Sequence, residues 1–90
     1  VIEDIENIVG TFLEIDIDAR EPSFKIHSNE ENITIKGKFE TSILEKVKND
    51  FVNIGKETYK FTIKTIYTPE TTLKSEEIKR FMIEYEKQVN

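Results

Sequence analysis

The sequence predicts an α+β fold, a two-layer sandwich in which two or three helices cover one face of a small four-stranded sheet. Two observations favour this class. Four segments alternate apolar and polar residues with the period of two that a half-buried strand shows. Other segments repeat apolar residues at the spacing of a helix with one buried face. We therefore expect the helices and the sheet to bury their apolar faces against each other.

The predicted strands span residues 13–19, 24–27, 32–40 and 58–67. In the first of them Leu13, Ile15 and Ile17 would lie on the inner face, with carboxylates on the outer face. The polar run 28–32 is typical of a turn, so the second and third strands are expected to form a hairpin.

One helix is predicted between the last two predicted strands, over residues 42–54. Ser42 and Glu45 have the spacing of a capping box, in which each side chain bonds the backbone amide of the other residue. Gly55 stands where a residue of left-handed conformation would close the helix. A helix of this length would place Leu44 and Phe51 on the sheet.

A second helix is predicted over residues 75–88. Ser75 is a good N-cap. The apolar residues that follow it have the spacing i, i+3, i+4, i+7 and i+11 of a helix face, and they are Ile78, Phe81, Met82, Tyr85 and Val89. Ile83 falls outside this stripe and would stay on the exposed side of the helix. A third, short helix is expected over residues 2–9, ending at Gly10.

Length and composition limit the classes of protein to which this chain can belong. The 90 residues are expected to form one domain, and the first residue, Val1, suggests a processed chain or a domain cut from a longer one. A chain of this size buries roughly 60–65 % of its unfolded surface, which suffices for one modest core. Without Cys there is neither a disulfide scaffold nor a thiolate metal site, and the compartment stays unknown. No apolar run approaches the roughly 20 residues that cross a bilayer, so no membrane span is expected.

Acidic residues are concentrated in the first third of the chain. Residues 1–31 carry a net charge of −7, whereas the remainder carries +2, which gives −5 in total. A surface of one sign steers the association of an oppositely charged partner, although acidic surfaces also serve solubility alone. The acidic third is therefore a candidate surface for a basic partner.

No catalytic constellation or phosphate-binding loop is present in the sequence. Glu14, Asp16 and Asp18 would share one strand face and could hold Mg²⁺ or Ca²⁺, but no second acidic cluster is placed to complete such a site. His27 is the single histidine and has no nucleophile beside it, so it is interpreted as a surface residue. We therefore predict no catalytic, metal or cofactor site.

Nucleic-acid binding is also not expected. Proteins that bind single strands on an open sheet present aromatic rings for the bases to stack on, and here the strand aromatics fall with the core residues. The net charge of −5 gives no general attraction for phosphate.

The sequence thus predicts a non-enzymatic module for protein binding or assembly. Its partner would be another protein or a second copy, docked on an exposed strand edge or on the helix that carries Ile83. Two alternatives stay open: an acidic inhibitor or immunity-type protein that neutralises a basic target, and a divalent-metal or enzymatic domain that uses the acidic strand. The candidate partner-binding residues are Glu14, Asp16, Asp18 and Ile83.

Overall fold

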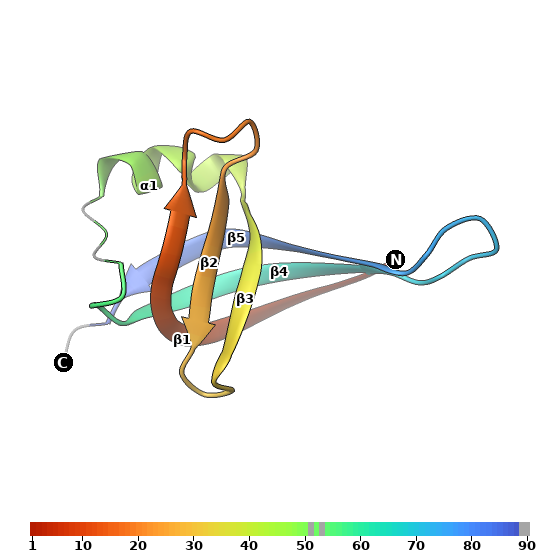
Figure 1. Ribbon diagram of the computed structural model, residues 1–90, viewed down its shortest axis with the longest axis horizontal. Helices are drawn as coiled ribbons and strands as arrows, with labels where there is room; N and C mark the ends of the chain where they lie inside the picture. The colour runs from red at the N-terminus through yellow and green to blue at the C-terminus, as the bar shows by residue number, and fades with distance from the viewer. Residues whose placement is uncertain (51, 53, 89–90) are drawn as a thin grey trace.

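The computed structural model describes residues 1–50, 52 and 54–88, which form five strands and one short helical segment (Figure 1). The elements in chain order are β1 (Ile2–Asp16), β2 (Ser23–Ser28), β3 (Ile33–Phe39), the 3-10 helix η1 (Thr41–Ile43), α1 (Leu44–Asn49), β4 (Tyr59–Thr68) and β5 (Glu77–Lys87).

The strands close into a barrel with the order β1-β2-β3-β5-β4. All neighbouring strands are antiparallel except β3 and β5, which are parallel and pair through Lys38 with Phe81 and Phe39 with Met82. The helical segment lies between β3 and β4 in the chain. A five-stranded Greek-key barrel with this order has the architecture of the OB-fold.

The predicted two-layer sandwich is therefore wrong, because two of the three predicted helices are strands. Residues 75–88 are mostly β5, whose inward residues Met82 and Tyr85 are only three positions apart. The register between β4 and β5 shifts here, so that β5 contains a bulge with Ile83 as the additional residue. A bulge changes the strand period locally, and the resulting spacing resembles that of a helix.

The predicted helix over residues 2–9 is the first half of β1. It pairs with β4 continuously, from Ile2 opposite Tyr67 to Gly10 opposite Tyr59. Of the apolar residues that suggested a helix, only Ile8 is buried. An isolated helix of this length has little stability of its own, whereas the ladder with β4 satisfies the backbone.

The middle helix is present but shorter than the predicted range 42–54, because η1 leads directly into α1 and α1 ends at Asn49. The N-caps are Glu40 for η1 and Ile43 for α1, so Ser42 lies inside η1 and is not the N-cap that the predicted capping box with Glu45 requires. Gly55 has the predicted left-handed conformation, with φ 76°, but it lies in a turn where its amide donates to the carbonyl oxygen of Phe12. Phe51 and Val89, which were expected on helices, lie outside the described residues.

The core fills the barrel and extends beneath the helical segment. Phe12 lies at its centre and is fully buried. The centroid of its ring lies 4.9 to 6.5 Å from the centroids of four other aromatic rings. The helical segment contributes Ile43 and Val47. The buried apolar residues are Ile8, Phe12, Phe24, Ile26, Ile35, Phe39, Ile43, Val47, Tyr59, Phe61, Ile63, Met82 and Tyr85.

Three strands continue beyond the barrel and form a projecting arm (Figure 1). We define the arm as residues 2–5 of β1, 64–68 of β4 and 77–80 of β5, together with the loop 69–76 that joins β4 to β5. Its strands are paired in the order β1-β4-β5, and it gives the molecule its long dimension of 48 Å against 30 and 17 Å. Within the described ranges, no helix has the length and apolar character needed to cross a membrane, in agreement with the sequence prediction.

Candidate functional site

The structure keeps Glu14 and Asp16 on one face of β1 and places Asp18, the third of the acidic residues predicted to share that face, beyond the end of the strand. Glu14 forms an ion pair with Lys25 across β1 and β2, with 3.6 Å between Oε2 and Nζ. Asp16 accepts a hydrogen bond from the amide of Ala19, and Asp18 lies in the connection that follows β1. No cluster of three or more His, Cys, Asp or Glu residues able to hold a metal ion occurs in the described ranges. A partner contact through these acidic residues stays a prediction.

Ile83 lies on the barrel and not on a helix. It occupies the bulge of β5 and is half-buried, next to Met82 in the core and Glu84 on the surface. The prediction that Ile83 contacts a partner assumed that it lies on the exposed side of a helix. Ile83 lies on a strand, so this contact stays a prediction and the helix no longer supports it.

The most distinctive feature of the surface is an open strand edge along the arm. The carbonyl oxygen of Val9 accepts a hydrogen bond from the amide of Asn29, 2.9 Å away, and the pairing of β1 with β2 begins at Gly10. Before this point, no strand in the described part of the chain pairs with β1 on the side away from β4. Residues 2–8 of β1 therefore have one neighbour instead of two.

The backbone groups at this edge follow from the hydrogen bond of Val9. Because successive residues of a strand direct their amide and carbonyl groups to opposite sides, every second residue before Val9 faces the open side. These residues are Glu3, Ile5 and Asn7. Each presents one donor and one acceptor, which is the template that an added strand needs.

The side chains along the open edge are acidic and apolar. Ile2 and Ile5 are 60 % and 58 % exposed, large values for isoleucine. Glu3 and Asp4 lie between these two isoleucines and Glu6 follows them, and no basic residue occurs before Arg20. The edge therefore combines apolar contact area with negative charge.

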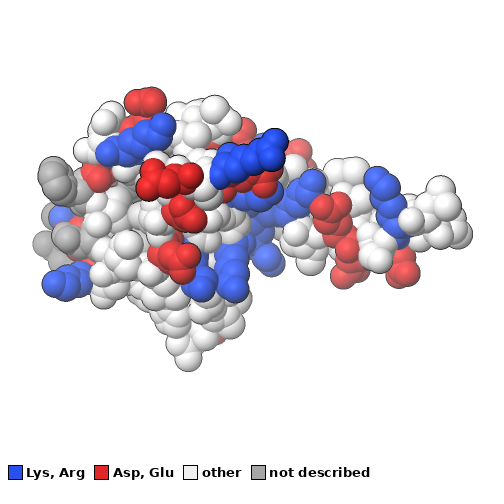
Figure 2. Space-filling view, turned by 45° about the horizontal axis from the view of Figure 1, so that its top comes forward, with Lys and Arg blue, Asp and Glu red and all other residues white. Residues whose placement is uncertain are grey.

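An apolar row also crosses the arm close to its end. Ile2, Tyr67 and Ile78 are opposite one another on the three strands, so their side chains share one face of the sheet. The Tyr67 hydroxyl donates a hydrogen bond to Glu76, which raises the pKa of Tyr67 above its ordinary value. In Figure 2 the far end of the arm is mostly uncharged surface.

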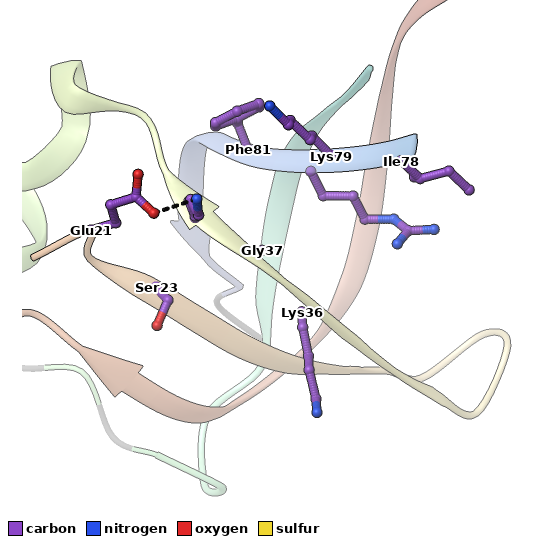
Figure 3. A pocket seen from close by; sticks show the side chains of 9 residues that line it. Glu21, Ser23, Lys36, Gly37, Ile78, Lys79 and Phe81 are labelled. Carbon is purple, nitrogen blue, oxygen red and sulfur yellow. Dashed lines mark hydrogen bonds and ion pairs between the residues drawn. The ribbon is translucent and has the colours of Figure 1, made fainter. Parts of the chain in front are cut away.

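A second feature is a cleft of about 420 Å³ between β3 and β5, near the base of the arm (Figure 3). Lys36 and Lys38 line it from β3, and Lys79 and Arg80 line it from β5. The remaining lining residues are Glu21, Ser23, Gly37, Ile78 and Phe81.

One of these cations is already engaged within the cleft. Lys38 binds Glu21 at 2.5 Å, and this hydrogen bond and ion pair lower the pKa of Glu21. Lys79 binds Glu77 at 3.3 Å. Among the described residues, Lys36 and Arg80 have no ion pair, so the cleft retains positive charge that its own carboxylates do not neutralise.

Comparison with models of known protein families, with curated proteins and with solved structures finds no match for this chain. The assignment to the OB-fold therefore rests on strand order and direction. Because barrels of this architecture serve many functions, the fold alone does not define the activity, and the arm and the cleft are the features that bear on it.

Proposed function

We propose that this domain is a non-enzymatic protein-binding module that takes up an extended segment of a basic partner along the open edge of β1. The observation that carries the proposal is that Glu3, Ile5 and Asn7 direct their backbone groups to a side where β1 has no neighbour among the described strands. Strand addition at such an edge is a common mode of peptide recognition, in which main-chain hydrogen bonds supply affinity and side chains supply specificity.

The energies are adequate for a weak to moderate interaction. Each backbone hydrogen bond contributes about 0.5–1.5 kcal/mol net, and three residues offer both a donor and an acceptor. Burial of Ile2 and Ile5 beneath a partner adds apolar area at about 25 cal/mol per Å². The ordering of the partner segment opposes these gains.

Charge selects the kind of segment. A strand added beside Glu3, Asp4 and Glu6 would place its own side chains directly across from carboxylates, and like charges in that position are unfavourable. Basic residues would form cross-strand pairs and would accelerate association at low salt. This proposal joins the two mechanisms suggested by the sequence, edge pairing and attraction of a basic target, at one surface.

The test is a selection of peptides from a random displayed library against the folded domain. We expect enrichment of peptides that alternate Lys or Arg with apolar residues. Ile5→Pro should abolish their binding, because proline removes the outward amide and its ring obstructs an added strand. Ile5→Thr keeps the amide and the β-branched shape, so it should bind the peptides.

A charge control separates the two contributions. Glu3→Gln, Asp4→Asn and Glu6→Gln together should weaken binding and reduce its dependence on salt. The matched control removes three carboxylates elsewhere, through Asp18→Asn, Glu30→Gln and Glu31→Gln, and should leave binding nearly unchanged. Enrichment of no peptide, or equal binding by Ile5→Pro and Ile5→Thr, would contradict the proposal.

A further inference from the structure

The cleft between β3 and β5 lies where two paired strands separate. Their parallel pairing comprises Lys38 with Phe81 and Phe39 with Met82. On the N-terminal side of this contact, β3 continues through Lys36 and β5 through Ile78, with the cleft between them (Figure 3). The cleft is therefore bounded by strand edges on both walls.

The backbone of each wall faces the cleft at a defined residue. The amide of Glu40 donates to the carbonyl oxygen of Met82, so Met82, Arg80 and Ile78 direct their backbone groups away from β4 and toward β3. On the other wall, the amide of Phe39 donates to Pro22 on the β2 side. Alternation then directs the backbone of Lys36 toward β5.

β3 and β5 approach each other closely at Gly37, one of the residues that line the cleft. Gly37 lies so near β5 that an added Cβ atom would be 2.5 Å from the carbonyl oxygen of Arg80. In the described part of the chain, β3 and β5 have no pairing beyond Lys38 and Phe81 on this side. Among the described residues, no strand therefore pairs with β3 at Lys36 or with β5 at Ile78 on the side of the cleft.

The charge of the cleft is positive. Four of its nine lining residues are Lys or Arg and one is Glu. Because Glu21 is bound by Lys38, the cations that remain for a ligand are Lys36, Arg80 and, through its exposed bond to Glu77, Lys79. An anionic ligand is therefore favoured, although the chain as a whole is acidic.

Two observations favour a peptide over a nucleic acid. A strand edge offers carbonyl acceptors as well as amide donors, and a phosphodiester backbone has no donor to satisfy the carbonyls. In addition, Phe81 is the only aromatic residue among the described residues that line the cleft, and the Lys64 ammonium lies 5.7 Å from the centre of its ring. A stacking surface for successive bases is therefore not formed there.

We propose that the cleft between β3 and β5 binds an acidic, extended peptide segment, held by strand addition at Lys36 or Ile78 and by the surrounding cations. This site is separate from the open edge of β1, which has the opposite charge and selects a basic segment. Binding at one site does not require binding at the other, so an experiment can disprove either proposal and leave the other unaffected.

The direct test is fluorescence anisotropy with a short labelled peptide that alternates Glu and Val, and with a labelled oligothymidylate of equal charge as the competing class. We expect the peptide to bind and the oligonucleotide to bind more weakly. Lys36→Gln with Lys79→Gln should weaken peptide binding by about tenfold or more, since a charge-assisted bond contributes on the order of 1.5–3 kcal/mol. Lys56→Gln with Lys74→Gln, which changes two lysines outside the cleft, should alter it less than about twofold, as expected for remote exposed charges.

A second pair of variants tests the strand edge itself. Ile78→Pro removes the amide that faces the cleft and should weaken binding, whereas Ile78→Thr should retain it. Ile5→Pro should leave binding of the acidic peptide unchanged, which separates this site from the edge of β1. Tighter binding of the oligonucleotide, absence of peptide binding, or equal affinity of the cleft and control lysine variants would overturn the proposal.

Discussion

The hydrogen bond from the amide of Asn29 to the carbonyl oxygen of Val9 marks the point where β1 loses its second neighbour. From Gly10 onward β1 lies between β2 and β4, and before Val9 the described part of the chain pairs it with β4 alone. One strand is thus a wall of the barrel in its second half and the edge of an exposed arm in its first half. The edge of β1 before Val9 is the surface that we propose for binding.

Proline substitutions along β1 should have effects that alternate with position. Ile5 directs its amide to the open side, so Ile5→Pro should cost less than about 1 kcal/mol of the free energy of unfolding. Glu6 directs its amide to β4, so Glu6→Pro should cost about 1–3 kcal/mol because a paired carbonyl loses its donor. Urea denaturation of both variants measures this difference. Equal losses would show that the backbone directions assigned here are wrong.

Phe12 should be far more important for stability than its neighbour Leu13. Phe12 is fully buried among aromatic rings, whereas Leu13 is 40 % exposed at a shift in the pairing of β1 with β2. Phe12→Ala should destabilise the domain by about 3–5 kcal/mol, through lost burial and the remaining cavity. Leu13→Ala should cost less than about 1 kcal/mol. Thermal or chemical unfolding of the pair measures both values, and a larger effect at Leu13 would contradict the packing.

Acid should loosen the attachment of α1 to β5. Lys46 bonds the Glu84 carboxylate at 2.5 Å and the carbonyl oxygen of Tyr85 at 2.6 Å. The first of these bonds lowers the pKa of Glu84 below its ordinary value of 4.5. Its stabilisation is therefore present above pH 4.5 and is lost as the pH falls through the lowered pKa of the folded state. The contribution of so exposed a pair should be below about 1 kcal/mol.

Glu84→Gln tests this pH dependence. The variant should be slightly less stable than the original chain at neutral pH and should lose less stability on acidification below pH 4.5. Glu86→Gln removes a carboxylate from the same strand, at a position without an ion pair among the described residues, and is the matched control. If the two variants show the same stability profile against pH, Lys46 and Glu84 do not contribute as described.

The sequence predicted the central strands because their alternation is regular. The hairpin of β2 and β3 and the strand β4 lie within one or two residues of the expected bounds. Gly55 also has its predicted left-handed conformation. In these strands the local alternation of apolar and polar residues agrees with the tertiary structure, so the local pattern was sufficient to predict them.

The two ends of the chain could not be predicted in the same way. In β5 the bulge at Ile83 places Met82 and Tyr85 three residues apart on one face, which an alternation of period two does not reveal. In β1 the apolar residues Ile2 and Ile5 are exposed on the arm, so they do not mark a buried face. Both the open edge and the cleft depend on β1 and β5 being strands, so neither could be located from the sequence, although the acidic first third and docking on a strand edge were both predicted.

Amide hydrogen exchange tests the central claim most directly. In the free domain, the amides of Glu3, Ile5 and Asn7 should exchange rapidly, while those of Asp4, Glu6 and Ile8 should be protected by β4. With the most enriched basic peptide bound, the first three amides should become protected as well. A bound peptide that leaves Glu3, Ile5 and Asn7 exchanging rapidly would show that the edge of β1 is not the binding site.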